Sequence, residues 1–129
     1  MESFLDATEA PVKYLCLVYH DETEIAAMPE CESATLLSEV LDYRDQLQRS
    51  GHHIVSSLLQ PVQSATTIRV RNGLMSISDG PFAETREQLG GFYLIEATDL
   101  NDAIRLVAKM PPARLGSIEV RPLKELDPP

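Results

Sequence analysis

Tryptophan is absent from this sequence, and aromatic residues make up only 5% of it. Proteins that bind bases or sugars often stack them on large aromatic side chains, so the chain offers no evident platform for either ligand. Cysteine occurs only as Cys16 and Cys31, and this spacing forms no disulfide framework. We therefore expect a reduced, cytoplasmic setting.

Basic residues are also scarce: 11 Lys and Arg face 20 Asp and Glu, which gives a formal net charge of -9. Such a surface repels phosphate backbones and anionic membranes, so we expect no direct binding to nucleic acid or membrane. The longest apolar runs, such as Tyr14–Tyr19, are far too short to cross a bilayer. The acidic stretch Met1–Asp6 lacks the basic-then-apolar order of a secretory signal, and we expect none.

A real hydrophobic core is possible, because 43% of the 129 residues are hydrophobic. The length fits one domain. We divide the chain into a loose acidic arm at residues 1–11, one domain at residues 12–124 and a short tail at residues 125–129.

The first half of the domain begins with a strand and a helix. The nearly continuous apolar run Val12–Tyr19 is rich in β-formers and predicts a strand covered on both faces. A polar loop is expected at His20–Cys31. Apolar residues then recur at helical spacing between a cap at Ser33 and about Ser50, and Gly51 ends the helix as a C-terminal cap would.

A hairpin is the clearest local prediction. After an extended stretch at Ile54–Val62, the runs Thr66–Arg71 and Leu74–Asp79 flank Asn72-Gly73, the strongest short hairpin signal. A two-residue turn fixes the register and places Asp79 opposite Thr66. One face then carries the apolar residues Ile68, Val70, Met75 and Ile77. Asp79 shares this face, and we expect it at the edge of the core.

The second half of the domain repeats a strand and a helix. We expect a strand at Gly91–Ala97, a helix from a cap at Asp99 to about Met110, and a final strand at Ser117–Pro122. Two βα units around a hairpin suggest an α+β sandwich of the ferredoxin-like kind.

The connection between the hairpin and the following strand is unusually rich in glycine and carboxylates. Long loops that a compact domain keeps between core strands tend to carry function. Asp79-Gly80-Pro81-Phe82-Ala83-Glu84-Thr85, with Leu89-Gly90-Gly91-Phe92-Tyr93, resembles the DGPF branch of the YCII-related family. Tyr14–Tyr19 and the closing stretch from Pro112 to Pro122 resemble it too, so the similarity covers about residues 12–124.

This resemblance implies a ferredoxin-like α+β fold that dimerises, sheet against sheet, into an α+β barrel with a deep cleft beside each sheet. Most members have no assigned activity. Some are encoded beside extracytoplasmic-function sigma factors, which implies a possible functional link to such a factor. Other YCII branches resemble small-molecule enzymes that use a His–Asp pair. Here Tyr19-His20-Asp21-Glu22 ends the first strand, Arg86 stands where Lys is frequent, and Ser56-Ser57 replaces a frequent Gly and Glu.

Asp79 and His20 are the candidate catalytic residues. A carboxylate on an apolar strand face would have a raised pKa and act as a general acid or base, but Asp at such a position also bonds the backbone of the turn that follows. Histidine is the side chain best suited to proton transfer near neutral pH, and Asp21 directly follows His20, although a histidine in a loop is also found simply at the surface.

Five residues are candidates for ligand binding. Glu84 and Arg86 would hold an anionic group, with Arg86 as the clamp, or belong to a solvated loop. Tyr19, Phe82 and Tyr93 would line a pocket for an aromatic ligand, or pack in the core and a dimer interface.

Neither metal nor cofactor chemistry is indicated. His52 and His53 are neighbours that would face opposite sides of a strand and cannot easily bind one ion. Cys16 is expected in the core, and Cys31 lies beside Glu30 and Glu32, which disfavour a thiolate. We expect no cofactor.

Two functions of different class follow. One is a homodimeric small-molecule-binding or regulatory module. The other is a cofactor-free lyase or isomerase that uses acid–base chemistry on a small aromatic or carboxylated substrate. The departures from the His–Asp branches favour the first.

Overall fold

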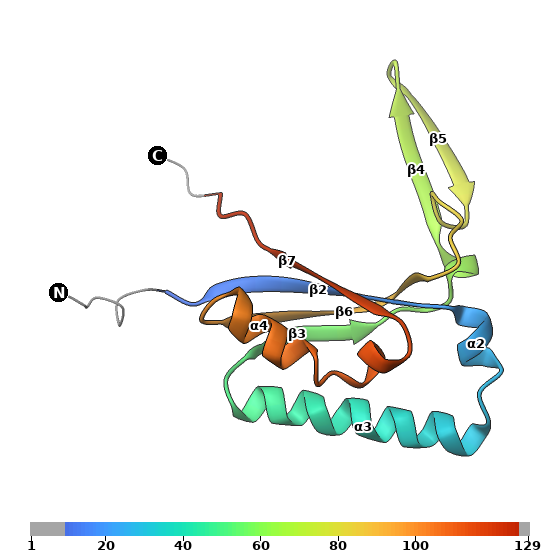
Figure 1. Cartoon of the computed structure of the whole chain (residues 1–129). Coiled ribbons are helices and arrows are strands. Elements are labelled where there is room, and N and C mark those ends of the chain that lie inside the picture. The colour runs from blue at the N-terminus through green and yellow to red at the C-terminus, as the bar shows by residue number, and fades with distance from the viewer. Residues whose placement is uncertain (1–9, 127–129) are drawn as a thin grey trace.

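The computed structural model describes residues 10–126. Most of the expected N-terminal arm and the last residues of the expected tail lie outside this range. The elements follow one another in chain order as shown in Figure 1: β2 (Val12–His20), α2 (Glu22–Ala26), α3 (Glu30–Arg49), β3 (His53–Leu58), the 3-10 turn η1 (Val62–Ser64), β4 (Thr66–Arg71), β5 (Leu74–Asp79), β6 (Gln88–Ala97), α4 (Leu100–Val107), the 3-10 turn η2 (Pro111–Arg114) and β7 (Ser117–Pro122).

A four-stranded antiparallel sheet in the order β3-β6-β2-β7 forms the centre of the molecule. Helices α3 and α4 lie on one side of it, and within the described residues the other side carries no helix (Figure 1). The α+β class expected from the sequence is therefore confirmed. Successive side chains of a strand point to opposite faces, so those of the two middle strands, β2 and β6, alternate between a face covered by the helices and an uncovered face.

The core lies between the sheet and its two helices. Alternate residues of β2 and β6 are buried there, among them Cys16 and Ile95, each 0% exposed. The helices add a few large side chains, including Tyr43, whose hydroxyl donates to the carbonyl of Leu106 at 2.7 Å. This bond connects α3 to α4 beneath the sheet and satisfies a buried phenol.

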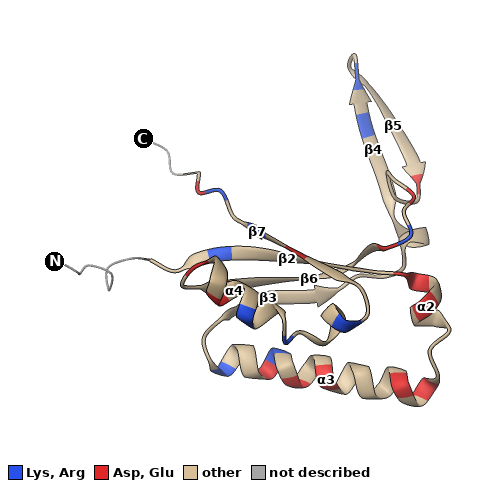
Figure 2. Ribbon diagram, in the orientation of Figure 1, with Lys and Arg blue, Asp and Glu red and all other residues tan. Residues whose placement is uncertain are grey.

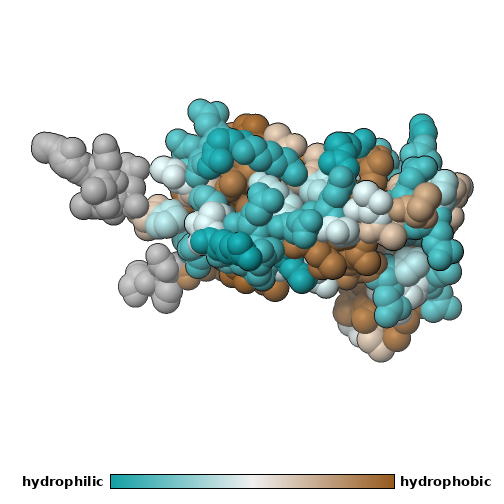
Figure 3. Space-filling view, turned by 90° about the horizontal axis from the view of Figure 1, so that it is seen from below, coloured by the Kyte–Doolittle hydropathy of each residue, from teal (hydrophilic) through white to brown (hydrophobic). Residues whose placement is uncertain are grey.

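The uncovered face of the sheet is also apolar. Leu15 pairs with Leu94 and Leu17 with Phe92, and all four are only partly exposed. Val55 of the edge strand lies beside Leu94 and is 44% exposed. We call these five residues the open sheet face. The opposite side of the molecule is formed by the helix layer and is more polar, because mainly hydrophilic side chains cover it (Figure 3).

The hairpin has the predicted register, with Thr66 opposite Asp79 and Arg71 opposite Leu74. Asn72 (φ 53°) and Gly73 (φ 77°) adopt the left-handed conformation that a tight turn requires. The expectation that one face meets the core is wrong, and Asp79 is exposed. The reason is that, among residues 10–126, β4 and β5 pair only with each other and project away from the main sheet (Figure 1).

Several element boundaries also differ from the prediction. The stretch expected as a polar loop contains α2, because the side chain of Asp21 accepts a hydrogen bond from the backbone of Thr23 and caps a short helix. Helix α3 begins directly after Pro29 and not at Ser33. Gly51 (φ 81°) ends α3 and Asp99 caps α4 as predicted.

The two cysteines lie in different surroundings, which predicts different reactivity. Burial raises the pKa of the Cys16 thiol to about 12, whereas Cys31 is exposed. Because the thiolate is the reactive form, we expect iodoacetamide to modify Cys31 in the folded protein and Cys16 only after unfolding. Mass spectrometry of the native and urea-treated protein measures this. Equal modification of both thiols in the native protein would contradict the packing of β2.

Candidate ligand-binding site

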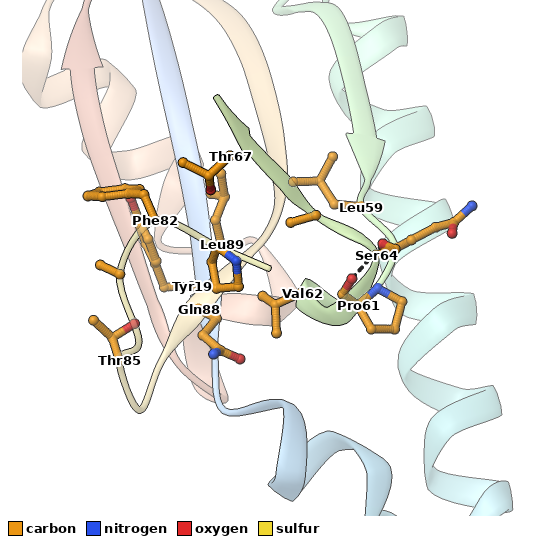
Figure 4. A pocket seen from close by; sticks show the side chains of 14 residues that line it. Tyr19, Leu59, Pro61, Val62, Ser64, Thr67, Phe82, Thr85, Gln88 and Leu89 are labelled. Carbon is orange, nitrogen blue, oxygen red and sulfur yellow. Dashed lines mark hydrogen bonds between the residues drawn. The ribbon is translucent and has the colours of Figure 1, made fainter. Parts of the chain in front are cut away.

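A cavity of about 650 Å³ lies where the main sheet meets the hairpin. Its walls are the two chain segments that connect the sheet with the hairpin, and Tyr19 of β2 completes it (Figure 4). The first wall consists of Leu59, Gln60, Pro61, Val62, Ser64, Ala65 and Thr67, and the second of Pro81, Phe82, Ala83, Thr85, Gln88 and Leu89.

No charged side chain occurs among the residues that line this cavity. The polar side chains of the lining are all neutral, and its three aliphatic hydroxyls already donate to backbone carbonyls: Thr67 to Gly80 at 2.8 Å, Ser64 to Pro61 at 2.6 Å and Thr85 to Glu87 at 2.6 Å. Tyr19, Gln60 and Gln88 supply further hydrogen-bonding groups beside the apolar residues of the lining. Small-molecule sites usually enclose about 300–1,000 Å³ and combine an apolar lining with a few polar groups, and this cavity has both properties.

The two walls meet at the root of the hairpin, where Gly80 connects them. Its N–H donates to the carbonyl of Ala65 at 2.7 Å, and its own carbonyl accepts from Thr67. Gly80 has φ 94°, a conformation that side chains with a Cβ rarely adopt. The Asp-Gly-Pro stretch therefore closes the hairpin and starts the second wall at Pro81.

Helix α2 holds both walls from outside. The carboxylate of Glu22 accepts from the backbone N–H of Val62 at 3.1 Å in the first wall. Arg86, at the end of the second wall, pairs with Asp21 at 3.3 Å and with Glu24 at 3.4 Å. We call these three contacts of α2 and its cap the α2 clamp. Through these contacts α2 touches the first wall at Val62 and the second wall at Arg86.

The charges of the clamp affect the titration of Asp21. Loss of water around the carboxyl acts to raise its pKa, but hydrogen bonds from Thr23 and Arg86 outweigh this effect, and the pKa lies below the ordinary value. Because the pKa is lowered by folding, the carboxylate stabilises the folded state at neutral pH. This contribution is lost only as the pH falls through the lowered pKa.

The structure separates the predicted ligand-binding residues. Tyr19 and Phe82 line the cavity together, and Phe82 is 79% exposed. Tyr93 lies in the core on the opposite face of the sheet and is 5% exposed. Glu84 is exposed and does not line the cavity, and Arg86 is engaged by α2.

His20 and Asp79, the candidate catalytic pair, also lie apart. Side chains alternate along β2, so Tyr19 points to the cavity while His20 points to the helix side. There His20 lines a second cleft, of about 190 Å³, with residues of α2, α3 and the η2 turn. A Cβ at Gly90 would overlap the His20 ring, so this glycine makes room for the imidazole. Asp79 lines neither space.

The first wall was missed by the sequence analysis. Its residues surround Pro61, and the stretch was expected to continue as an extended segment. A signal was present in the sequence, because the apolar residues Leu59 and Val62 flank Gln60-Pro61 directly after a strand. A proline at this position ends strand pairing, so these two side chains need another surface to pack against.

The histidine pair His52-His53 makes separate contacts. His52 Nδ1 lies 2.8 Å from the carbonyl of Glu96, and His53 Nε2 lies 2.8 Å from the Ser56 hydroxyl. Between residues 10 and 126, no group of three or more His, Cys, Asp or Glu side chains is arranged to hold a metal ion. No helix in that range is long and apolar enough to span a membrane.

These features define an α+β protein with an uncharged cavity at one end of a half-covered sheet. The model of the YCII-related domain matches residues 12–127, and the chain therefore belongs to this family. It is also similar to an uncharacterized protein of Rhizobium meliloti (strain 1021). The two are 35% identical over 112 residues, which cover 85% of this chain and 90% of that protein.

The α2 clamp can be tested by changing Glu22. We expect Glu22→Ala to lower the free energy of unfolding by about 1 kcal/mol, because the N–H of Val62 loses its partner. For a chain of this size the melting temperature should fall by about 4 °C. Glu22→Gln keeps an acceptor oxygen and should recover most of the loss. Equal melting temperatures for wild type and Glu22→Ala, measured by calorimetry, would contradict the clamp.

Proposed function

We propose that this protein is a homodimeric module that binds a small, uncharged, mainly apolar molecule in the cavity between the sheet and the hairpin. The observation that carries the proposal is the lining of that cavity, which combines apolar walls with a few neutral polar groups and no charge. An ionic ligand would lose its hydration there without gaining an opposite charge, whereas an apolar ligand gains by leaving water.

The dimer part of the proposal rests on the open sheet face. The element order β-α-β-β-α-β with strand order β3-β6-β2-β7 is that of a ferredoxin-like sandwich, with the hairpin inserted before β6. Such a sheet has one face free when its helices lie on the other. Apolar residues on an uncovered face favour a second copy as the covering layer, which would complete a dimeric α+β barrel.

The geometry supports binding better than acid–base catalysis. A general acid and a general base must both reach the same substrate, and the substrate must lie in a space they share. His20 and Asp79 line no common cavity, and neither of them lines the cavity proposed for the ligand. The arrangement of these side chains therefore favours ligand binding over catalysis.

The cavity can be tested with N-phenyl-1-naphthylamine, an uncharged aromatic dye that fluoresces in apolar sites. We expect wild type to bind it with saturable fluorescence, and Ala83→Trp to weaken binding about tenfold, because the indole fills space between the walls. Ala108→Trp, on the exposed end of α4, is the matched control and should bind like wild type. Saturable binding that persists in Ala83→Trp would place the dye elsewhere and refute the proposed site.

The dimer can be tested by placing a charge on the open sheet face. We expect wild type to sediment as a dimer at micromolar concentration, and Leu17→Asp to sediment as a monomer, since a buried unpaired carboxylate opposes association. Gln48→Asp adds the same charge to an exposed position of α3 and should leave the dimer intact. Circular dichroism checks that each variant is folded. A monomeric wild type would refute the dimer, whatever the variants do.

A further inference from the structure

We infer that the β4–β5 hairpin is an arm that packs against a second copy of this chain and, through its root, sets the width of the ligand cavity. This inference rests on the proposed function and adds to it a route by which dimer formation controls ligand binding. It concerns a part of the chain that the open sheet face does not include.

The arm has a long apolar side that no other part of residues 10–126 covers. Ile68, Val70, Met75 and Ile77 are each between 58% and 64% exposed, and they share one side of the hairpin by the alternation of their strands. A two-stranded hairpin alone is marginally stable in water and needs a further layer. An apolar surface on the order of 500 Å², as these residues provide, is at the upper end of what monomers normally expose.

The position of the arm points to a second copy as that layer. The arm projects on the side of the sheet that α3 and α4 leave free (Figure 1), so it is continuous with the side on which a partner would cover the open sheet face. In a two-fold dimer each copy contributes one arm, so two apolar surfaces on the order of 500 Å² each are available. Stable interfaces bury about 1,200–2,000 Å², and the two open sheet faces add apolar area toward that range.

Charge also favours this partner. The chain carries a formal net charge of -9, yet the arm has Arg69 and Arg71 on its polar side and only Asp79 at its root. Figure 2 shows the contrast between these arginines and the acidic start of the helix layer at α2 and α3. A net positive arm reduces the repulsion that two acidic copies otherwise experience.

The arm is mechanically connected to the cavity. Strand β4 follows the first wall without a gap at Thr66, and β5 leads at Asp79 directly into the second wall. Gly80 fastens the two together at the root. A change in the direction of the arm must therefore move at least one wall. A partner that holds the arm in one orientation holds the cavity at one width and removes part of the ordering cost of binding.

The experiment compares arm variants that lie away from the cavity. In Val70→Asp/Met75→Asp the changed residues face each other across the apolar side. We expect the dimer dissociation constant to rise about tenfold or more in sedimentation equilibrium. At concentrations where wild type is dimeric, we expect the affinity for N-phenyl-1-naphthylamine to fall at least about threefold. Ser76→Asp adds charge to the polar side of the same strand and should change neither quantity.

The outcomes separate this inference from the function on which it rests. A dimer that survives Val70→Asp/Met75→Asp but dissociates in Leu17→Asp refutes the arm and leaves the proposed dimer standing. Loss of the dimer with unchanged dye affinity refutes the connection to the cavity. Absence of dye binding in wild type refutes the proposed function itself. Should the double Asp variant fail the circular dichroism check, Val70→Ser/Met75→Ser is measured in its place, with the same outcomes.

Discussion

The closure of the hairpin root at Gly80 is the constraint on which the cavity and the arm both depend. Its two hydrogen bonds, to Ala65 and from Thr67, bring the two connecting segments together before either reaches the main sheet. Since Gly80 has φ 94°, a residue with a Cβ would strain this closure, and Pro81 then fixes the direction in which the second wall leaves. The Asp-Gly-Pro stretch thus has a structural reason that requires no chemistry from the Asp79 carboxylate.

A second constraint divides the molecule into two sides. The pairing of β2 with β6 shifts between Val18 and Tyr19, and Gly90 is the extra residue opposite this step. Because side chains alternate along β2, Tyr19 and His20 point to opposite faces, one into the cavity and one into the cleft beneath the sheet. The phenol and the imidazole therefore lie in different spaces, and the missing side chain at Gly90 leaves room for the His20 ring.

Local sequence patterns predicted much of the fold. The parts that were not predicted depend on contacts between distant residues, which such patterns do not encode. Asn72-Gly73 determined the hairpin register because a two-residue turn leaves no other pairing. The direction of the hairpin depends on contacts at Gly80 and α2, which no alternation pattern encodes, so the exposure of Ile68 and Met75 was not foreseen. The cavity was only half predicted for the same reason. Tyr19 and Phe82 were named, whereas the wall around Pro61 is positioned by the distant carboxylate of Glu22.

The distribution of charge around the cavity decides which ligands are compatible with the proposed function. Asp21, Glu22 and Glu24 stand behind the cavity walls and hold them, so the site has carboxylates around it and none inside. Arg86, the residue expected to clamp an anion, already pairs with two of these carboxylates. An anionic ligand would have to displace such a pair and also approach an acidic surface. In the proposed function, selection of the ligand would therefore rest on shape and on the release of water from apolar surface.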